Sequence, residues 1–287
     1  MQQIRAIVQS IASEGILRQL ILLTTTSYHM KIVLSPAKSQ DFETPWTSAV
    51  TPTKPIFLKT TAQLVKTLSK LDKAELAKTL SVSATLAKRN YQAYQTWTMT
   101  HSLKTAKPAL LAYTGDVYQQ LSAALYTEHQ QRYAQDNLRI VTGLYGYLRA
   151  YDLIRPYRLE MKTKIHHSGD QVRMSDFWRT RITKRVQKEL QADEQPLLIN
   201  LASQEYTAAV DFEKIDQPYY SITFQQVKSG QPPKVIGLLA KRARGMMLEY
   251  LIRNGCTTLE EVKRFAAYGY SLTKETEHDL VFTSEEV

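Results

Sequence analysis

The stretch Met30-Lys31-Ile32-Val33-Leu34-Ser35-Pro36-Ala37-Lys38 combines two patterns that recur along this chain of 287 residues. Its apolar, β-branched first half predicts a short buried β-strand over 31–34. Its second half places a hydroxyl group and an ammonium group directly beyond the end of that strand. Because ligand clefts of sheet proteins form at strand ends, the stretch predicts both a core strand and one wall of a binding site.

Apolar runs of the same kind predict five more strands, with helical periodicity between several of them. The predicted strands cover 109–113, 138–142, 197–201, 219–227 and 235–240. Apolar residues at helical spacing predict helices over 58–68, 177–190 and 246–251. We therefore predict a mixed α/β (α+β) fold, with one domain over 30–287 and a sheet flanked by helices.

Three turn and cap patterns refine this prediction. Ser229-Gly230-Gln231-Pro232-Pro233 predicts a hairpin turn between neighbouring strands, so part of the sheet is expected to be antiparallel. Asn254-Gly255 is a typical helix C-terminus. Thr258-Leu259-Glu260-Glu261 has the form of a capping box and predicts the start of another short helix.

Residues 1–29 differ from the rest of the chain, and we interpret them as an N-terminal extension outside the fold because Met30 runs straight into a strand. Their apolar stretch is interrupted by Arg18 and Gln19 and is shorter than the roughly 20 residues that a membrane-spanning helix needs. The single cysteine, Cys256, permits no internal disulfide. We expect a cytoplasmic protein that does not enter membranes, with a monomer favoured.

The charge balance predicts an anionic partner. Lys and Arg number 37 against 27 for Asp and Glu, which gives a formal net charge of +10 at pH 7. Nucleic acid, an anionic membrane surface and a phosphorylated small molecule all suit such a charge.

Residues 72–94 resemble a helix-hairpin-helix DNA-binding element. Asp72 and Glu75 predict the start of a first helix, and a second helix is expected after Ser81-Val82-Ser83. In such hairpins the tight turn offers backbone N–H groups to a phosphate. Ser81 and Ser83 stand where glycines are usual, and their hydroxyls can donate to phosphate. Further phosphate contacts are expected from Lys78, Lys88 and Arg89. The alternative is an ordinary helical hairpin that packs on the sheet.

Polar motifs come directly after the predicted strands, where several of them could share one cleft. The five motifs lie at 35–38, 114–118, 143–161, 200–206 and 241–245, and the third begins with Gly143-Leu144-Tyr145-Gly146. Together these motifs resemble the YaaA-type peroxide-stress resistance family, from Met30 to about Phe282. The resemblance implies a cytosolic protein that limits peroxide damage from unincorporated iron, to DNA above all. The motif residues that it carries over are Lys38, Asp116, Arg158, Glu160, Lys241 and Arg244.

These residues suggest what the cleft could bind. The cations Lys38, Arg158, Lys241 and Arg244 would suit phosphate. Asp116 and Glu160 would orient the cations, and together with Lys38 they are the candidates for a catalytic role. The candidates for stacking on a base are Tyr118, Tyr145 and Tyr157. The alternative is a buried ion-pair network, with Arg158 and Glu160 paired on one face of a strand.

The leading hypothesis is a non-enzymatic protein that binds DNA without sequence preference. Its rival is an enzyme acting on a nucleotide or another phosphorylated small molecule in the same cleft. We predict no metal site, because His166-His167 lies at an expected hairpin tip and no cysteine cluster or di-iron pattern is present. We expect no cofactor, since the chain has neither a P-loop nor a dinucleotide fingerprint. Ser203 is expected to cap a helix and not to act as a nucleophile.

Overall fold

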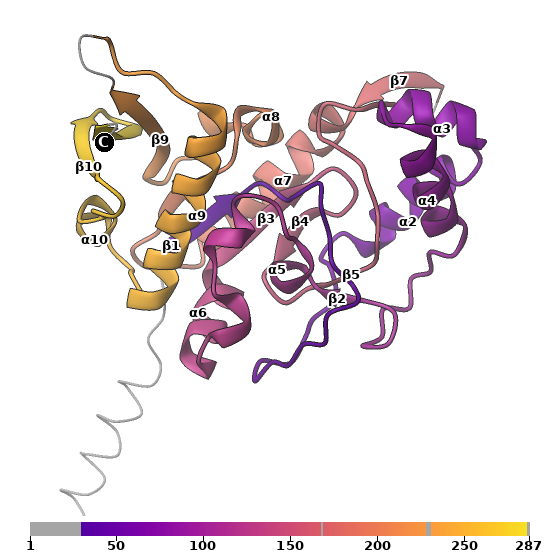
Figure 1. Ribbon diagram of the computed structural model, residues 1–287, viewed down its shortest axis with the longest axis horizontal. Coiled ribbons are helices and arrows are strands. Elements are labelled where there is room, and N and C mark those ends of the chain that lie inside the picture. The colour runs from indigo at the N-terminus through magenta and orange to yellow at the C-terminus, as the bar shows by residue number, and fades with distance from the viewer. Residues whose placement is uncertain (1–29, 168, 228–230, 286–287) are drawn as a thin grey trace, which may run out of the picture.

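The structure is a computed structural model that describes residues 30–167, 169–227 and 231–285 (Figure 1). The described chain contains a seven-stranded mixed sheet in the order β10-β11-β9-β8-β1-β3-β4. Its strands are β1 (Met30–Leu34), β3 (Leu138–Thr142), β4 (Gly146–Arg149), β8 (Leu197–Asn200), β9 (Tyr219–Val227), β10 (Tyr270–Glu275) and β11 (Asp279–Glu285). Strand β1 is buried along its whole length and pairs in parallel with both β3 and β8. The predicted core strand is therefore central to the sheet.

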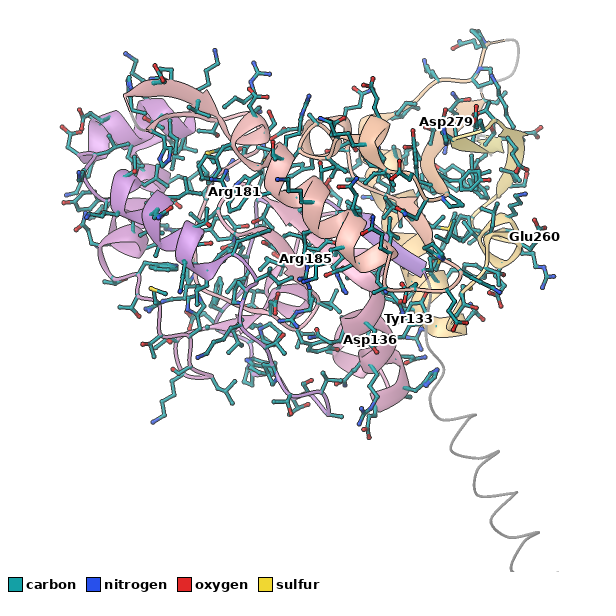
Figure 2. All side chains as sticks on the ribbon, turned by 180° about the vertical axis from the view of Figure 1, so that it is seen from behind. Tyr133, Asp136, Arg181, Arg185, Glu260 and Asp279 are labelled. Carbon is teal, nitrogen blue, oxygen red and sulfur yellow. The ribbon has the colours of Figure 1, made fainter. Side chains whose placement is uncertain are left out.

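Helices cover both faces of this sheet (Figures 1 and 2). Helices α6 (Glu128–Asn137) and α9 (Gly237–Asn254) lie on one face, where α6 contacts β1 and α9 contacts β9. Helix α7 (Met174–Leu190) covers the other face. Apolar side chains from the sheet and these helices form one continuous buried cluster. The mixed α/β fold predicted from the sequence is confirmed.

The other elements of the described chain are short or peripheral. Two-stranded sheets pair β2 (Lys107–Pro108) with β5 (Leu153–Ile154), and β6 (Lys164–His167) with β7 (Asp170–Arg173). Other helices are α2 (Leu58–Leu68), α3 (Lys73–Leu80), α4 (Ala84–Gln95), α5 (Ala109–Ala112), α8 (Gln204–Thr207) and α10 (Leu259–Lys263). Single 3-10 turns are η1 (Tyr118–Gln120), η2 (Ala123–Leu125) and η3 (Phe212–Lys214).

Two predicted strands are wrong. Residues 109–112 form helix α5, and residues 237–240 are the first turn of α9. Both segments contain consecutive Ala and Leu residues, which are strong helix formers, and a short apolar run does not by itself distinguish a strand from a helix.

The two antiparallel strand pairs of the sheet do not flank the predicted turn at 229–233. They are β3–β4 and β10–β11. The chain does reverse at the predicted turn, where the described residues form an isolated antiparallel bridge between Gln226 and Lys234, but α9 follows it and not a second strand. Residues 228–230 and the predicted extension 1–29 lie outside the described residues.

Three local predictions are confirmed. Gly255 ends α9 in the left-handed conformation, and Thr258 forms a capping box with Glu261 at the start of α10. Strands β6 and β7 form the predicted hairpin on either side of residue 168. In the part of the chain that the structure describes, no helix is both long and apolar enough to cross a bilayer.

Candidate functional site

A pocket of about 400 Å³ lies beyond the carboxyl ends of β1 and β8. The polar residues that line it are Ser35, Lys38, Ser39, Asp116, Tyr118, Ser203, Glu205, Tyr206, Lys241 and Arg244. They come from four of the five predicted motifs, which are far apart in the sequence. Strand ends therefore bring these motifs together, as the sequence predicted.

Close backbone packing holds the walls of this pocket together. A Cβ on Gly115 would lie 2.9 Å from the Ala37 Cβ, and a Cβ on Gly245 would overlap the carbonyl oxygen of Val117. The loop around Asp116 is thus clamped between the β1 motif and helix α9. Tyr118, in η1, ties the same loop to the end of β1 by donating its hydroxyl to the Ser35 carbonyl oxygen at 2.9 Å.

Arg158 and Glu160 border a smaller hollow that shares Lys38 and Tyr206 with the main pocket. Glu160 is only 7% exposed and is surrounded by cations. It lies 3.1 Å from Lys38 Nζ, 3.1 Å from Arg158 Nη2 and 3.2 Å from Lys162 Nζ. Burial alone would raise the pKa of Glu160, but hydrogen bonds from Lys38 and Lys162 hold it below its ordinary value. The carboxylate therefore stays ionised and anchors the three cations.

The Arg158–Glu160 pair that the sequence left open is formed, although its residues lie in irregular backbone and not on a strand. On the far wall Lys241 is more loosely paired, with its Nζ 3.8 Å from Asp116 Oδ2. The cleft and the ion-pair network, which the sequence offered as alternatives, are therefore both present.

Arg244 differs from the other cations of the cleft. Among the described residues it forms no ion pair, and its Nε is buried without a hydrogen-bond partner. The Nε of Arg158, in the neighbouring hollow, is also buried and unpartnered. Burial lowers the pKa of the Arg244 guanidinium below its ordinary value. A buried donor without an acceptor costs free energy, and an anionic ligand would supply the acceptor at both residues.

The three tyrosines proposed for stacking lie close to the cleft but are packed. Tyr118, Tyr145 and Tyr157 are at most 6% exposed. The Tyr145 and Tyr157 rings pack edge to face with their centroids 5.3 Å apart. The Tyr157 hydroxyl lies 2.6 Å from that of Tyr113. Stacking on a base therefore stays a prediction, and the packing of these rings disfavours it.

Sequence reasoning missed part of the cleft. Glu205 and Tyr206 line the main pocket, and Lys162 completes the cation cluster around Glu160. Ser203 is the N-cap residue of α8, but its side chain makes no capping bond and its Oγ lies 3.3 Å from Ser35 Oγ. The sequence does signal this wall, because the polar motif at 200–206 comes directly after a strand.

The predicted helical hairpin consists of α3 and α4. Asp72 and Glu75 form the predicted capping box, Ser81 ends α3 with φ of 52°, and the Ser83 side chain caps α4. The side chains proposed for phosphate contacts, Lys78, Lys88 and Arg89, are exposed and form no ion pair within the described chain. Tyr94 of α4 donates its hydroxyl to the Arg158 carbonyl oxygen at 2.6 Å, which links the hairpin to the cleft.

The described residues contain no group of three or more His, Cys, Asp or Glu side chains placed to hold a metal ion. Cys256 is 2% exposed, and burial raises the pKa of its thiol to about 11.

Fold and site together define a mixed α/β protein with a charged cleft at the carboxyl ends of its parallel strands. The chain belongs to the peroxide stress protein YaaA family, whose model matches residues 30–276. The family resemblance seen in the motifs is therefore confirmed.

The chain is also similar to proteins named only as UPF0246 proteins. It is 40% identical over 260 residues to one from Aliivibrio fischeri strain MJ11, covering 90% of this chain and 99% of that one. Identity is 38% over 259 residues to one from Saccharophagus degradans, covering 90% and 100%. A third, from Clostridium beijerinckii, is 38% identical over 260 residues, covering 89% and 98%.

Proposed function

We propose that this member of the peroxide stress protein YaaA family is a cytosolic, non-enzymatic DNA-binding protein that holds the phosphate backbone without sequence preference. In this proposal the covered DNA is shielded from iron-dependent oxidative damage. The family supplies the link to peroxide stress, and the distribution of cations supports the binding.

The observation that carries the proposal is that uncompensated cations occupy two linked surfaces. One is the cleft, where Arg244 has no acidic partner in the described chain. The other is the α3–α4 hairpin, with exposed and unpaired Lys78, Lys88 and Arg89. A single small phosphate would satisfy the first surface only. A polyanion satisfies both, because it presents phosphates at regular spacing.

The backbone of the hairpin also suits a phosphate. Ser81 and Ser83 are exposed, and they stand at the turn from which the 12-residue helix α4 starts. The first N–H groups of a helix lack intrahelical partners and favour negative charge. Ser83 satisfies the Leu86 N–H, so its neighbours in the first turn can donate to a phosphate oxygen.

The test is a titration of the protein into labelled duplex DNA at several salt concentrations. We compare the wild type with Lys78→Gln/Lys88→Gln/Arg89→Gln. Three lost phosphate contacts should reduce the slope of log affinity against log salt by about 2.7. The control variant loses the same charge at exposed cations outside α3, α4, α7 and α9: Lys104→Gln/Arg264→Gln/Lys274→Gln. Equal slopes for the two variants, or no binding by the wild type, would reject the proposal.

A second candidate function rests on the size of the main pocket. A volume of about 400 Å³ suits a small ligand, and Asp116 and Glu205 could accept hydrogen bonds from sugar hydroxyls. An enzyme acting on a nucleotide or another phosphorylated small molecule would use such a pocket. Calorimetric titration with nucleoside monophosphates tests it, because Arg244→Met should abolish their binding if the pocket holds the phosphate. Absence of binding by the wild-type protein would reject this second candidate.

A further inference from the structure

Helix α7 carries a row of cations that the proposed function does not use. Arg181, Lys184 and Lys188, which we call the α7 stripe, are exposed. Figure 2 labels Arg181 on this helix. We infer that the α7 stripe is a second phosphate-binding surface, by which one protein molecule engages a second DNA segment. This inference rests on the proposed DNA binding.

The charges of the α7 stripe are available to a ligand. The fourth cation on this side of the helix, Arg185, is held by Glu189, which also binds the buried Arg139. Arg181, Lys184 and Lys188 form no ion pair within the described part of the chain. Exposed cations without acidic partners are the side chains that contact phosphates without reading sequence.

Arg181 is also held in a defined position. Its Nη1 donates to the Phe177 carbonyl oxygen at 2.8 Å, and its guanidinium carbon lies 4.7 Å from the centre of the Phe177 ring. An arginine fixed by stacking loses less side-chain entropy when it binds an anion. The stripe therefore contains one oriented cation beside two flexible ones.

The spacing of the stripe matches a nucleic-acid strand. Residues at i, i+3 and i+7 lie on one side of a helix, and seven residues of α-helix extend about 10 Å. Phosphates rise by about 3.4 Å per nucleotide along the axis of B-DNA, and the winding of the strand places neighbouring phosphates further apart than this, so the stripe reaches at most three of them. The three cations can thus contact successive phosphates.

The position of α7 shows why the stripe would bind a separate segment. Lys241 and Arg244 belong to α9, which lies on the other face of the sheet from α7 (Figures 1 and 2). The cleft itself opens beyond the carboxyl ends of β1 and β8, so a duplex held there leaves the outer side of α7 to a second segment. In this proposal two DNA segments bind at the same time, and the protein bridges them.

The experiment mixes the full-length protein with two short duplexes, one labelled with a donor dye and one with an acceptor dye. At about 50 mM salt, where phosphate contacts are strong, the wild type should give energy transfer between the duplexes. Sedimentation should find one protein with two duplexes in the assembly. Arg181→Gln/Lys184→Gln/Lys188→Gln should abolish the transfer while its affinity for the first duplex stays within about two-fold, because distant sites act independently.

The control is the variant Lys104→Gln/Arg264→Gln/Lys274→Gln, which has the same net charge and should retain the transfer. If the wild-type protein binds one duplex but gives no energy transfer, this inference is overturned and the proposed DNA binding is not. Transfer that survives in the stripe variant, or that comes only from assemblies with two proteins, would overturn it as well. Wild-type protein that binds no DNA would overturn the inference together with the proposed function.

Discussion

At the scale of single residues, Arg244 is a cation of the cleft that forms no ion pair with any described residue. Its Nε is buried without an acceptor, and burial lowers the pKa of its guanidinium. A protein keeps an unsatisfied buried donor at a cost in stability, which is typical of binding sites. Stability and binding are therefore expected to oppose each other at this residue.

Arg244→Met tests this opposition directly. Methionine keeps much of the length of the side chain and removes the unsatisfied charge, so the free energy of unfolding should rise by about 1 kcal/mol. Affinity for phosphate-bearing ligands should fall. Urea denaturation measures the first effect, and the DNA titration measures the second. A variant that is less stable than the wild type would show that the guanidinium is a structural element.

Cys256 is the single cysteine of the chain, so oxidation of a thiol by peroxide would depend on it. Burial is the main reason why the pKa of its thiol is raised to about 11. The reactive form of cysteine is the thiolate, which is scarce at neutral pH when the pKa is this high. At pH 8 the folded protein should react with an alkylating agent roughly 100-fold more slowly than the urea-unfolded protein. Equal rates would mean that Cys256 is exposed and ionised, as expected of a redox sensor.

At the scale of elements, helix α9 must approach the Asp116 loop closely. Gly245 makes this approach feasible, because any Cβ there would overlap the Val117 carbonyl oxygen. Helix α9 also carries Lys241, which faces Asp116 across the pocket. The position of the helix therefore sets the width of the cleft.

Gly245→Ala should lower the free energy of unfolding by about 2 kcal/mol, because it forces α9 away from the loop. Gly237→Ala in the same helix is the matched control, since nothing lies within 4 Å of its added methyl group. Gly237 is the first residue of the helix and its added methyl group meets no atoms, so a change within about 0.5 kcal/mol is expected there. Thermal unfolding of both variants gives the comparison, and equal shifts would contradict the close packing of α9.

Helices and strands could be predicted from the sequence where the local pattern of apolar and capping residues matched the side chains that the fold buries. Strand β9 has the predicted bounds, and Gly255 and Thr258 mark the boundaries that their cap patterns predicted. Prediction failed at 109–113 and 235–240, where short apolar runs carry no periodicity that separates strand from helix. The polar motifs predicted the place of the cleft, but the unpaired state of Arg244 depends on distant residues that no local pattern reveals.

At the scale of the whole molecule, buried carboxylates determine the response to acid. Burial alone would raise the pKa values of Glu160 and Glu189, but neighbouring cations hold both below the ordinary value. A carboxyl group with a lowered pKa in the folded state stabilises the fold above its unfolded pKa, and that contribution is lost as pH falls through the folded value. Asp152 opposes this trend, because burial raises its pKa.

We expect the free energy of unfolding to be nearly constant from about pH 8 to 7. It should begin to fall as pH drops through about 6.5, because burial lowers the pKa of His101, and it should fall further below about pH 4.3, the ordinary pKa of Glu. Urea midpoints measured across this range test the expectation. Glu189→Gln should cost about 3 kcal/mol at neutral pH, because it leaves the buried Arg139 without its carboxylate partner, and it should weaken the acid dependence. An unchanged acid dependence in this variant would assign the effect to other groups.

The central position of β1 has a consequence for the synthesis of the chain. Met30 of β1 pairs with Leu197 of β8, so the ribosome makes the two partners roughly 170 residues apart. At about 5–20 residues per second, roughly 8 to 30 seconds separate them. During that interval β1 presents unpaired backbone groups and apolar side chains, which other nascent chains can pair with. A strand that is fully buried in the native protein is therefore open to aggregation while the chain grows, and slower initiation or a chaperone at the ribosome exit should raise the yield of folded protein.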